Sequence, residues 1–407
     1  MANAIRPTTE EEVREAVAEA LARATAIDIA GGGSKRPLGR AVDPPRRLEV
    51  SGLAGISLYE PEELVMTAGA GTPLAEIEAR VADAGQGLAF EPPDWRALLG
   101  TSDAAPTIGG TMACNLSGPR RIKAGAARDH VLGVRVVSGR GEVFKSGGRV
   151  VKNVTGYDMS KLMVGSYGTL GVMTEITLKV LPAAEKIRTV LVAGLDEADA
   201  IVALARALNS PNDVSAAAHL PARAASRSAV SYVREAGSSV TAVRIEGSEP
   251  SVAARCQALR DDLAELGEIE ELHRHNSATL WREIGDVSPF AGDDDRDVWR
   301  LSVPPASGAE IAGAVGREVD AEAFYDWGGG LVWLAVAGDE ERAGEVVRKV
   351  VGQYDGHAML VRAPASRRAR LDVFEPRTGP AAALNRRLKE GFDPTGILNP
   401  GRMYDGM

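Results

Sequence analysis

Cysteine and histidine are scarce in this 407-residue chain, which contains two cysteines and five histidines. Cys114 and Cys256 form neither a metal-binding spacing nor a disulfide framework, so reduced cytoplasmic surroundings are the simplest expectation. Cys114 stands among small residues with no histidine beside it, and we expect a buried thiol rather than a nucleophile. So few thiols also exclude an iron–sulfur cluster held by this chain alone.

Long apolar runs and positive net charge are also lacking. The longest apolar stretch, residues 328–338, has the length of a buried strand, and the N-terminus is polar and soon acidic. We therefore expect no signal peptide and no membrane span, so any membrane contact would come through a partner. A net charge of −9 argues against nucleic acid as a partner. The basic run at residues 120–123 favours a solvated turn, with attraction of an anionic ligand as the alternative.

The common nucleotide-binding motifs are missing as well. The chain has no Gly-Lys-Ser/Thr tripeptide, which a Walker loop requires. Gly69 and Gly71 follow an apolar run and precede an expected helix, but Leu74 stands where a dinucleotide fingerprint needs glycine or alanine. The acidic run at 293–297 lacks the alternation and distal Glu of a calcium loop, and we expect a solvated loop there. We predict no metal site.

Glycine-rich turns are abundant instead, and they concentrate in residues 106–182. Turns at 107–110, 117–118, 153–156 and 168–171 lie between short β-branched runs. Glycine exposes backbone N–H groups to an anion, and neighbouring Thr, Ser and Asn add donors. A further turn, Gly-Gly-Gly-Ser-Lys at 31–35, follows an expected strand and predicts a pyrophosphate nest, with a flexible turn as the alternative. Together the turns indicate walls around a long, phosphate-bearing cofactor.

Hydrophobic periodicity predicts two kinds of architecture along the chain. Before residue 184 the pattern predicts an N-terminal helix opened by a Thr8–Glu11 capping box, a second helix at 72–85, and strands at 26–30, 47–50, 64–68 and in a hairpin at 131–145. The strand–helix–strand unit that begins at residue 64 should pack beside that hairpin. The stretch 91–105 is irregular, and Trp95 within it is expected to be a packing anchor rather than a stacking partner.

From residue 186 strand–helix–strand units repeat without glycine motifs. Strands are expected at 187–193, 214–219, 240–246, 268–272, 298–303, 332–337 and 358–362, and helices at 197–208, 250–266, 308–315 and 340–351. This order predicts a split ferredoxin-like antiparallel sheet covered by helices on one face. A helix near 381–392 and two Pro/Gly turns close the chain.

The glycine turns, together with residues 125–129 and the C-terminal Asp393-Pro394 and Asn399-Pro400-Gly401, resemble the vanillyl-alcohol oxidase family. The resemblance is specific over about residues 25–182 and 390–404. It implies an α+β, two-domain flavoprotein. Its expected parts are an FAD-binding domain at 1–184, a ferredoxin-like antiparallel-sheet cap at 185–380, and a segment at 381–407 that returns to the FAD-binding domain.

By the same resemblance, the turns would hold FAD. The first turn and the 107–110 turn would hold the pyrophosphate, and the other turns the ribityl chain, the adenosine part and the flavin edge. The implied cofactor-binding residues are Gly31, Gly32, Gly33, Ser34, Lys35, Thr107, Ile108, Gly109, Gly110, Asn115, Ser117, Gly118, Gly168, Thr169, Gly171 and Val172. Members that bind FAD covalently have a histidine where Ser34 and Lys35 stand, so the FAD is expected to be non-covalent.

The residues expected near the substrate differ from those of the family's catalytic members. Catalytic members resembling D-lactate and glycolate dehydrogenases carry a histidine-rich strand, but the equivalent residues 326–333 keep only the glycines, and Tyr167 replaces an acid. His130 is expected to be structural, and His273 and His275 to share an exposed strand face. His219 and His357 have no companions in the sequence. Tyr157 and Lys152 remain alternatives for a general base, and the catalytic residues stay unassigned.

Residues 92–95 and 151–158 are most similar to the FAD-binding subunits of bacterial glycolate oxidase complexes. This resemblance implies oxidation of glycolate, a small 2-hydroxy acid, to glyoxylate, together with a larger catalytic FAD subunit and an iron–sulfur subunit. The expected location is cytoplasmic, or peripheral to the inner membrane through the complex. Two alternatives remain: a stand-alone FAD-dependent 2-hydroxy-acid or alditol dehydrogenase, and a non-catalytic scaffold subunit.

Overall fold

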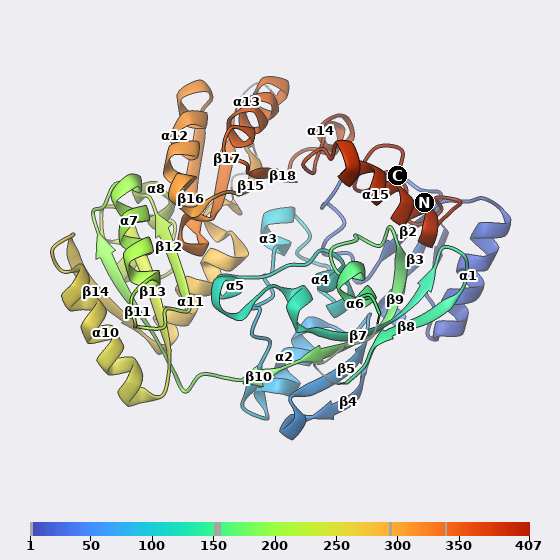
Figure 1. Cartoon of the computed structure of the whole chain (residues 1–407), viewed down its shortest axis with the longest axis horizontal. Coiled ribbons are helices and arrows are strands. Elements are labelled where there is room, and N and C mark those ends of the chain that lie inside the picture. The colour runs from blue at the N-terminus through green and yellow to red at the C-terminus, as the bar shows by residue number, and fades with distance from the viewer. Residues whose placement is uncertain (1–2, 150–155, 293–294, 338–339) are drawn as a thin grey trace.

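The computed structural model describes residues 3–149, 156–292, 295–337 and 340–407. Two lobes face each other, one around a five-stranded sheet and the other around an eight-stranded sheet (Figure 1). The turn expected at 153–156 falls largely outside the described residues. Within them, no helix is long and apolar enough to cross a bilayer.

The first lobe begins with a helix that packs on a small parallel sheet. Helix α1 (Glu10–Ala22) buries Val13, Val17 and Ala20 against the sheet, whose strands are β1 (Asn3–Ile5), β3 (Arg46–Glu49) and β2 (Ile27–Ala30). The predicted capping box at Thr8 and Glu11 is wrong by one residue. Thr9 is the N-cap and accepts a hydrogen bond from the Glu12 N–H, and the Glu12 carboxylate accepts one from the Thr8 N–H.

The five-stranded sheet is antiparallel throughout. Its order is β4 (Ile56–Glu60), β5 (Val65–Gly69), β9 (Gly171–Lys179), β7 (Val131–Ser138) and β8 (Val143–Gly147). The hairpin β7–β8 forms as the sequence predicts. The expected packing of β5 beside this hairpin is wrong, because β9 lies between them. Helix α2 (Leu74–Ala82) covers the sheet with Ile77 and Val81.

The eight-stranded sheet consists of two ferredoxin-like units joined edge to edge. Its order is β14 (Glu268–His273), β11 (Lys186–Ala193), β13 (Val240–Gly247), β12 (Ala216–Leu220), β16 (Ala321–Asp326), β17 (Leu331–Val336), β15 (Asp297–Ser302) and β18 (His357–Arg362). All pairs are antiparallel, and the two units meet where His219 pairs with Tyr325. The sequence predicted the ferredoxin-like sheet but predicted neither β16 itself nor its joint with β12.

The two faces of this sheet are covered differently. The outer face packs against α7 (Glu197–Leu208), α10 (Glu249–Leu263), α12 (Gly308–Glu318) and α13 (Glu340–Gly352). The inner face packs against α11 (Arg274–Asp286) and against Trp95, Leu98 and Leu116 of the first lobe. Covering helices on a single face were expected, so α11 corrects that expectation. The inner face therefore forms the wall between the lobes.

Two local expectations in the second lobe are wrong. His273 ends β14 and His275 lies in α11, so the two histidines do not share a strand face. Asp297 is not in a solvated loop: it begins β15, is buried, and forms an ion pair with Arg367. Residues 293 and 294 of the same acidic run lie outside the described residues.

The C-terminal segment is attached to the first lobe. After α14 (Ala365–Arg370) and α15 (Gly379–Phe392), the Ile27 N–H donates to the Ile397 carbonyl, and the Ile29 N–H donates to the Asn399 side chain. The buried Lys389 Nζ donates to the Asp393 carboxylate at 2.7 Å and to the carbonyls of Thr169 and Leu398 at 2.9 Å each. This ammonium thus connects α15, the final turn and the glycine turn at 168–171.

We expect Lys389→Met to lower the free energy of unfolding by about 3–5 kcal/mol, because it removes the counter-charge of the buried Asp393 carboxylate and the donor to two carbonyls. The N–H groups of Ile397 and Leu398 still donate to that carboxylate. The exposed pair between Lys349 and Glu318 gives a matched control, and Lys349→Met should cost less than about 1 kcal/mol. Urea unfolding of both variants measures the difference. Equal losses in the two variants would contradict a structural role for Lys389.

Candidate functional site

The glycine turn after β2 forms a tight nest. A Cβ on Gly31 would lie 2.2 Å from the Thr107 hydroxyl, and a Cβ on Gly32 would lie 2.0 Å from the Ala105 carbonyl. Only glycine therefore fits at these positions. The nest opens into a cavity of about 60 Å³. Its lining includes Ile29, Ala30, Gly31, Gly32, Gly33, Ser34, Lys35, Arg36, Thr107, Gly110, Ala113, Cys114, Tyr167, Asn399 and Arg402.

Two cations make this cavity attractive to an anion. The Lys35 ammonium hydrogen-bonds to the Ser34 hydroxyl at 3.3 Å, and Arg402 donates to the Arg36 carbonyl at 2.8 Å. Burial lowers the pKa of both groups. In the described parts of the chain, neither cation is ion-paired with a carboxylate. A phosphate would supply the missing negative charge, so the donor set fits the pyrophosphate of a dinucleotide cofactor.

The turn at 107–110 supports the nest from the other side. The Thr107 hydroxyl accepts a hydrogen bond from the Gly110 N–H, at the start of the short helix α4 (Ile108–Ala113). Gly109 packs against Ala70, whose carbonyl would lie 2.6 Å from a Cβ at this position. Ile108 is fully buried in the core of the first lobe. Thr107 and Gly110 therefore line the cavity, while Ile108 and Gly109 lie behind it.

The other predicted cofactor residues surround the nest at greater range. Asn115 and Ser117 accept hydrogen bonds from the N–H groups of Arg128 and Ala127, and thereby hold the 115–118 loop. Gly168 lies beside Ile29 and Asn399, which line the cavity. Thr169 lines a separate cavity of about 480 Å³ beside α15, and Gly171 and Val172 are buried in β9. Their assignment to the cofactor stays a prediction.

Tyr167, which stands where the family has an acid, joins the two lobes. Its hydroxyl lies 3.9 Å from the Met359 sulfur on β18, and its ring meets Phe374 edge-on with centroids 4.9 Å apart. Burial raises the pKa of Tyr167 well above its usual value. The Trp95 indole, also at the lobe interface, meets Trp333 edge-on at 5.4 Å and donates to the Gly285 carbonyl. Trp95 is thus a packing anchor, as predicted.

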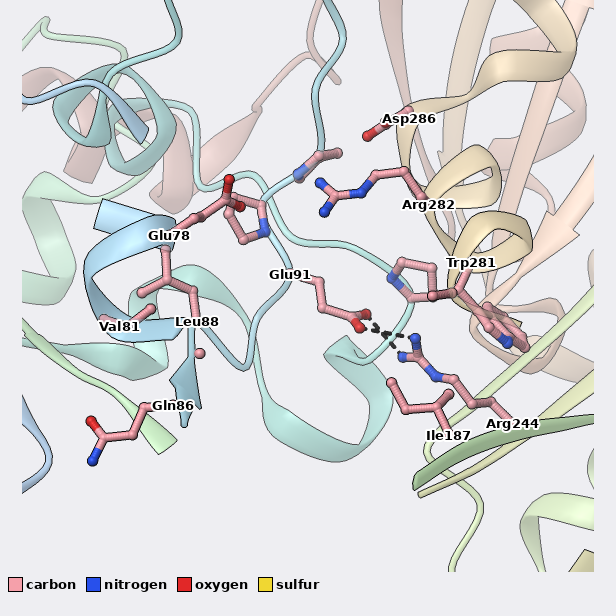
Figure 2. Close-up of a pocket in the computed structure, with 16 residues that line it drawn as sticks. Glu78, Val81, Gln86, Leu88, Glu91, Ile187, Arg244, Trp281, Arg282 and Asp286 are labelled. Carbon is pink, nitrogen blue, oxygen red and sulfur yellow. Dashed lines mark hydrogen bonds and ion pairs between the residues drawn. The ribbon is translucent and has the colours of Figure 1, made fainter. Parts of the chain in front are cut away.

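A pocket of about 350 Å³ lies between the lobes, and sequence reasoning missed it. Glu91 of the first lobe and Arg244 of β13 point toward each other and form two contacts of 2.9 Å (Figure 2). Burial raises the pKa of Asp286 to about 6, and it also raises the pKa of Glu78 on the facing wall. The pocket could not be found from the sequence because its walls come from residues 78–119 and 187–286.

The candidate general bases do not gather at the nest. His130 is buried as a structural histidine and hydrogen-bonds to the Ala124 carbonyl. His219 is buried at the joint of the large sheet, where burial lowers its pKa to about 4. Tyr157 is 91% exposed and does not line the nest cavity, so its role as a base stays an untested alternative. Lys152 lies outside the described residues. Across the described ranges, no group of three potential metal ligands occurs.

Asp326, at the end of β16, is the acid nearest to the altered glycine strand. It is 2% exposed, and its carboxylate accepts a hydrogen bond from the Trp327 N–H at 2.7 Å. Burial raises its pKa to about 7. The Trp327 indole donates to the Gly118 carbonyl at 3.2 Å, so this corner of the large sheet contacts a predicted cofactor loop.

Comparisons with known proteins agree with this geometry. A family model described as an FAD binding domain matches residues 1–147. Glycolate oxidase subunit GlcE of Escherichia coli is 35% identical over 391 residues, which are 96% of this chain and 96% of that protein. Glycolate oxidase subunit GlcD of Bacillus subtilis is 42% identical over 102 residues, 25% of this chain and 21% of that protein. The match to the structure of p-cresol methylhydroxylase with substrate bound covers 99% of this chain and 88% of that chain, with a TM-score of 0.73 and 15% identity.

The fold and the nest define an FAD-binding oxidoreductase of the vanillyl-alcohol oxidase type. Within this class, the chain belongs to the family of the glycolate oxidase subunit GlcE.

We expect Asp326→Asn to flatten the dependence of stability on pH. With a pKa raised from 3.8 to about 7, the folded protein keeps a proton between these pH values that the unfolded chain releases. The free energy of unfolding should therefore fall as pH rises through this window, by up to about 4 kcal/mol. The amide oxygen of the variant can still accept from the Trp327 N–H.

Urea unfolding between pH 4 and pH 8 tests this expectation. Asp326→Asn should gain stability relative to the native chain as pH rises, whereas Asp103→Asn, at an exposed position, should not. Parallel pH profiles for the native chain and Asp326→Asn would show that Asp326 is not held protonated by burial.

Proposed function

We propose that this chain is the FAD-binding subunit of a glycolate oxidase complex that oxidises glycolate to glyoxylate. The 35% identity to GlcE along nearly the whole of both chains carries this proposal. The cation-bearing nest gives it a physical basis, because the charge and donors there suit the pyrophosphate of FAD. Bound FAD would supply the hydride and electron chemistry, and the protein would supply binding, orientation and exclusion of water.

The FAD would be held without a covalent bond. Ser34 and Lys35 occupy the position that carries the linking histidine in covalent members, and neither side chain offers that linkage. The nest and the 107–110 turn would bind the pyrophosphate, and the 115–118 and 168–172 segments the rest of the cofactor. We further propose that residues 1–184 are the FAD-binding domain, residues 185–380 the cap, and residues 381–407 a segment that completes the first domain.

The proposed partners are a larger FAD subunit similar to GlcD and an iron–sulfur subunit that passes electrons onward. The similarity to GlcD supports the relationship to the first of these. The two cysteines of this chain cannot hold a cluster, so the cluster would lie on a partner. A cytoplasmic location, with membrane contact through the complex, follows from this assignment.

The arrangement of side chains favours oxidation within the complex over a stand-alone dehydrogenase. His130 and His219 are committed to structural hydrogen bonds, and His273, His275 and His357 lie on the second lobe, away from the nest. A relay, storage or scaffold role for this subunit is consistent with the position of the five histidines, none of which lines the nest cavity. A stand-alone FAD-dependent dehydrogenase is the alternative function, because the nest that would bind FAD is intact.

We expect Gly109→Ala to lose most of its FAD on purification. The added methyl group would lie 2.6 Å from the Ala70 carbonyl and would displace the 107–110 turn that supports the nest. Gly316→Ala is the matched control, because nothing lies within 4 Å of a Cβ at that helical position. Visible absorbance per mole of protein measures retention. If Gly109→Ala is as yellow as the control, the proposed flavin position is wrong.

The same spectrum tests the function itself. For the native chain, flavin bands should leave with the supernatant after acid precipitation, because the FAD is non-covalent. Under anaerobic conditions glycolate should bleach the flavin only when the larger subunit is present. Bleaching of the isolated chain would make it a dehydrogenase in its own right. A colourless chain that takes up no added FAD would leave only the scaffold role.

A further inference from the structure

In the part of the chain that the structure describes, two arginines without an ion pair lie where the lobes meet. Arg300 stands on β15, opposite Trp333 of β17 and Met359 of β18, on the inner face of the large sheet. Its guanidinium lies 5.1 Å from the centre of the Trp327 ring. The Arg121 guanidinium, from the first lobe, lies 4.4 Å from the centre of the same ring. Two positive groups from different lobes therefore share one indole.

These two charges are not compensated. Neither side chain makes a hydrogen bond or an ion pair with another of the residues that the structure describes. Arg300 is partly buried, and burial lowers its pKa to about 10, so it stays charged at neutral pH. The charged and titratable groups that it faces are Tyr167, Arg121 and Asp326. Among these groups, Asp326 supplies at most one negative charge, which does not neutralise two guanidinium groups.

The two arginines also lie close to the loops that are predicted to hold the flavin. The Trp327 indole donates to the Gly118 carbonyl, and Arg121 follows that glycine by three residues. Tyr167, which faces Arg300, also lines the cavity of the nest. The two guanidinium groups thus lie where the loops predicted to hold the flavin face the inner side of the large sheet. A ligand between them would contact both lobes and would lie beside the cofactor.

We propose that Arg300 and Arg121 form a subsite for the carboxylate of a small 2-hydroxy acid, beside Trp327. The planar guanidinium fork matches a carboxylate in a bidentate manner. The subsite rests on the proposed function, which supplies the substrate class. It concerns binding only and does not require this chain to carry out the oxidation.

Equilibrium titration of the full chain, with and without added FAD, tests the subsite. Glycolate and acetate, which carry a carboxylate, should bind, and ethylene glycol, which lacks one, should not. Arg300→Gln should weaken glycolate binding about tenfold or more, the effect of one lost charge-assisted hydrogen bond. Arg121→Gln should weaken it less, because Arg121 is exposed. Arg300→Lys should fall between Arg300→Gln and the native chain.

Arg188→Gln is the matched control, because Arg188 lies on the same sheet but is paired with Glu271 at 3.0 Å. Its glycolate affinity should equal that of the native chain. If Arg300→Gln does not fold, Arg300→Lys and Arg121→Gln still carry the test. An unchanged affinity in the Arg300 and Arg121 variants overturns the subsite, as does native binding of ethylene glycol equal to that of glycolate, or native binding of neither glycolate nor acetate.

Two further outcomes separate this inference from the proposed function. If Arg300→Gln keeps its glycolate affinity but loses FAD, the arginine serves the cofactor and the carboxylate subsite is wrong. If the native chain takes up no FAD, the proposed function fails, and the titration of the FAD-free chain still decides whether the two arginines bind a carboxylate.

Discussion

A chain of charges across the lobe interface holds the loop on which the candidate site depends. Arg244 of the large sheet is 2% exposed and binds the Glu91 carboxylate with both of its terminal nitrogens. Glu91 also accepts from the Arg120 N–H, and Arg120 pairs with Glu246, next but one to Arg244 on β13. Buried ion pairs are costly to break, since removal of one partner leaves an uncompensated charge. This network therefore fixes the 118–121 loop against the large sheet.

The 118–121 loop contacts both lobes. Toward the first lobe, Gly118 donates to the Phe90 carbonyl and continues the loop that carries Asn115 and Ser117. Toward the second lobe, its carbonyl accepts from Trp327, and Arg121 reaches the same indole. One turn thus joins the predicted flavin loops to the inner face of the large sheet. The relative position of the lobes is set by charges and by aromatic contacts, not by apolar packing alone.

Cations lie in two separate places, in the nest and beside the inner face of the large sheet. The nest carries Lys35 and Arg402 and suits a phosphate, whereas Arg121 and Arg300 lie nearer to the large sheet and suit a smaller planar anion. The chain as a whole is acidic, with a net charge of −9, so these cations are local exceptions. Negative charge elsewhere discourages unspecific binding of polyanions.

The sequence alone determined the local features, because they depend on neighbouring residues. Glycine turns, the β7–β8 hairpin and the strand–helix order of the first ferredoxin-like unit follow from backbone freedom and hydrophobic periodicity. In the second unit the pattern missed β16. The sequence also contains a pattern for helix α11, because its buried residues recur at helical spacing: Ser277, Leu280, Trp281 and Ile284. This helix was not predicted, because His273 and His275 were assigned to one strand face. The family resemblance rests on the same short motifs.

Only the tertiary structure decided which distant residues meet. The joint between β12 and β16, the placement of β9 between β5 and the hairpin, and the pairing of Glu91 with Arg244 all join segments far apart in the chain. Arg121 and Arg300 reach one indole only because the large sheet presents its inner face to the 118–121 loop. Periodicity shows that a face is buried, but it does not show what lies against it.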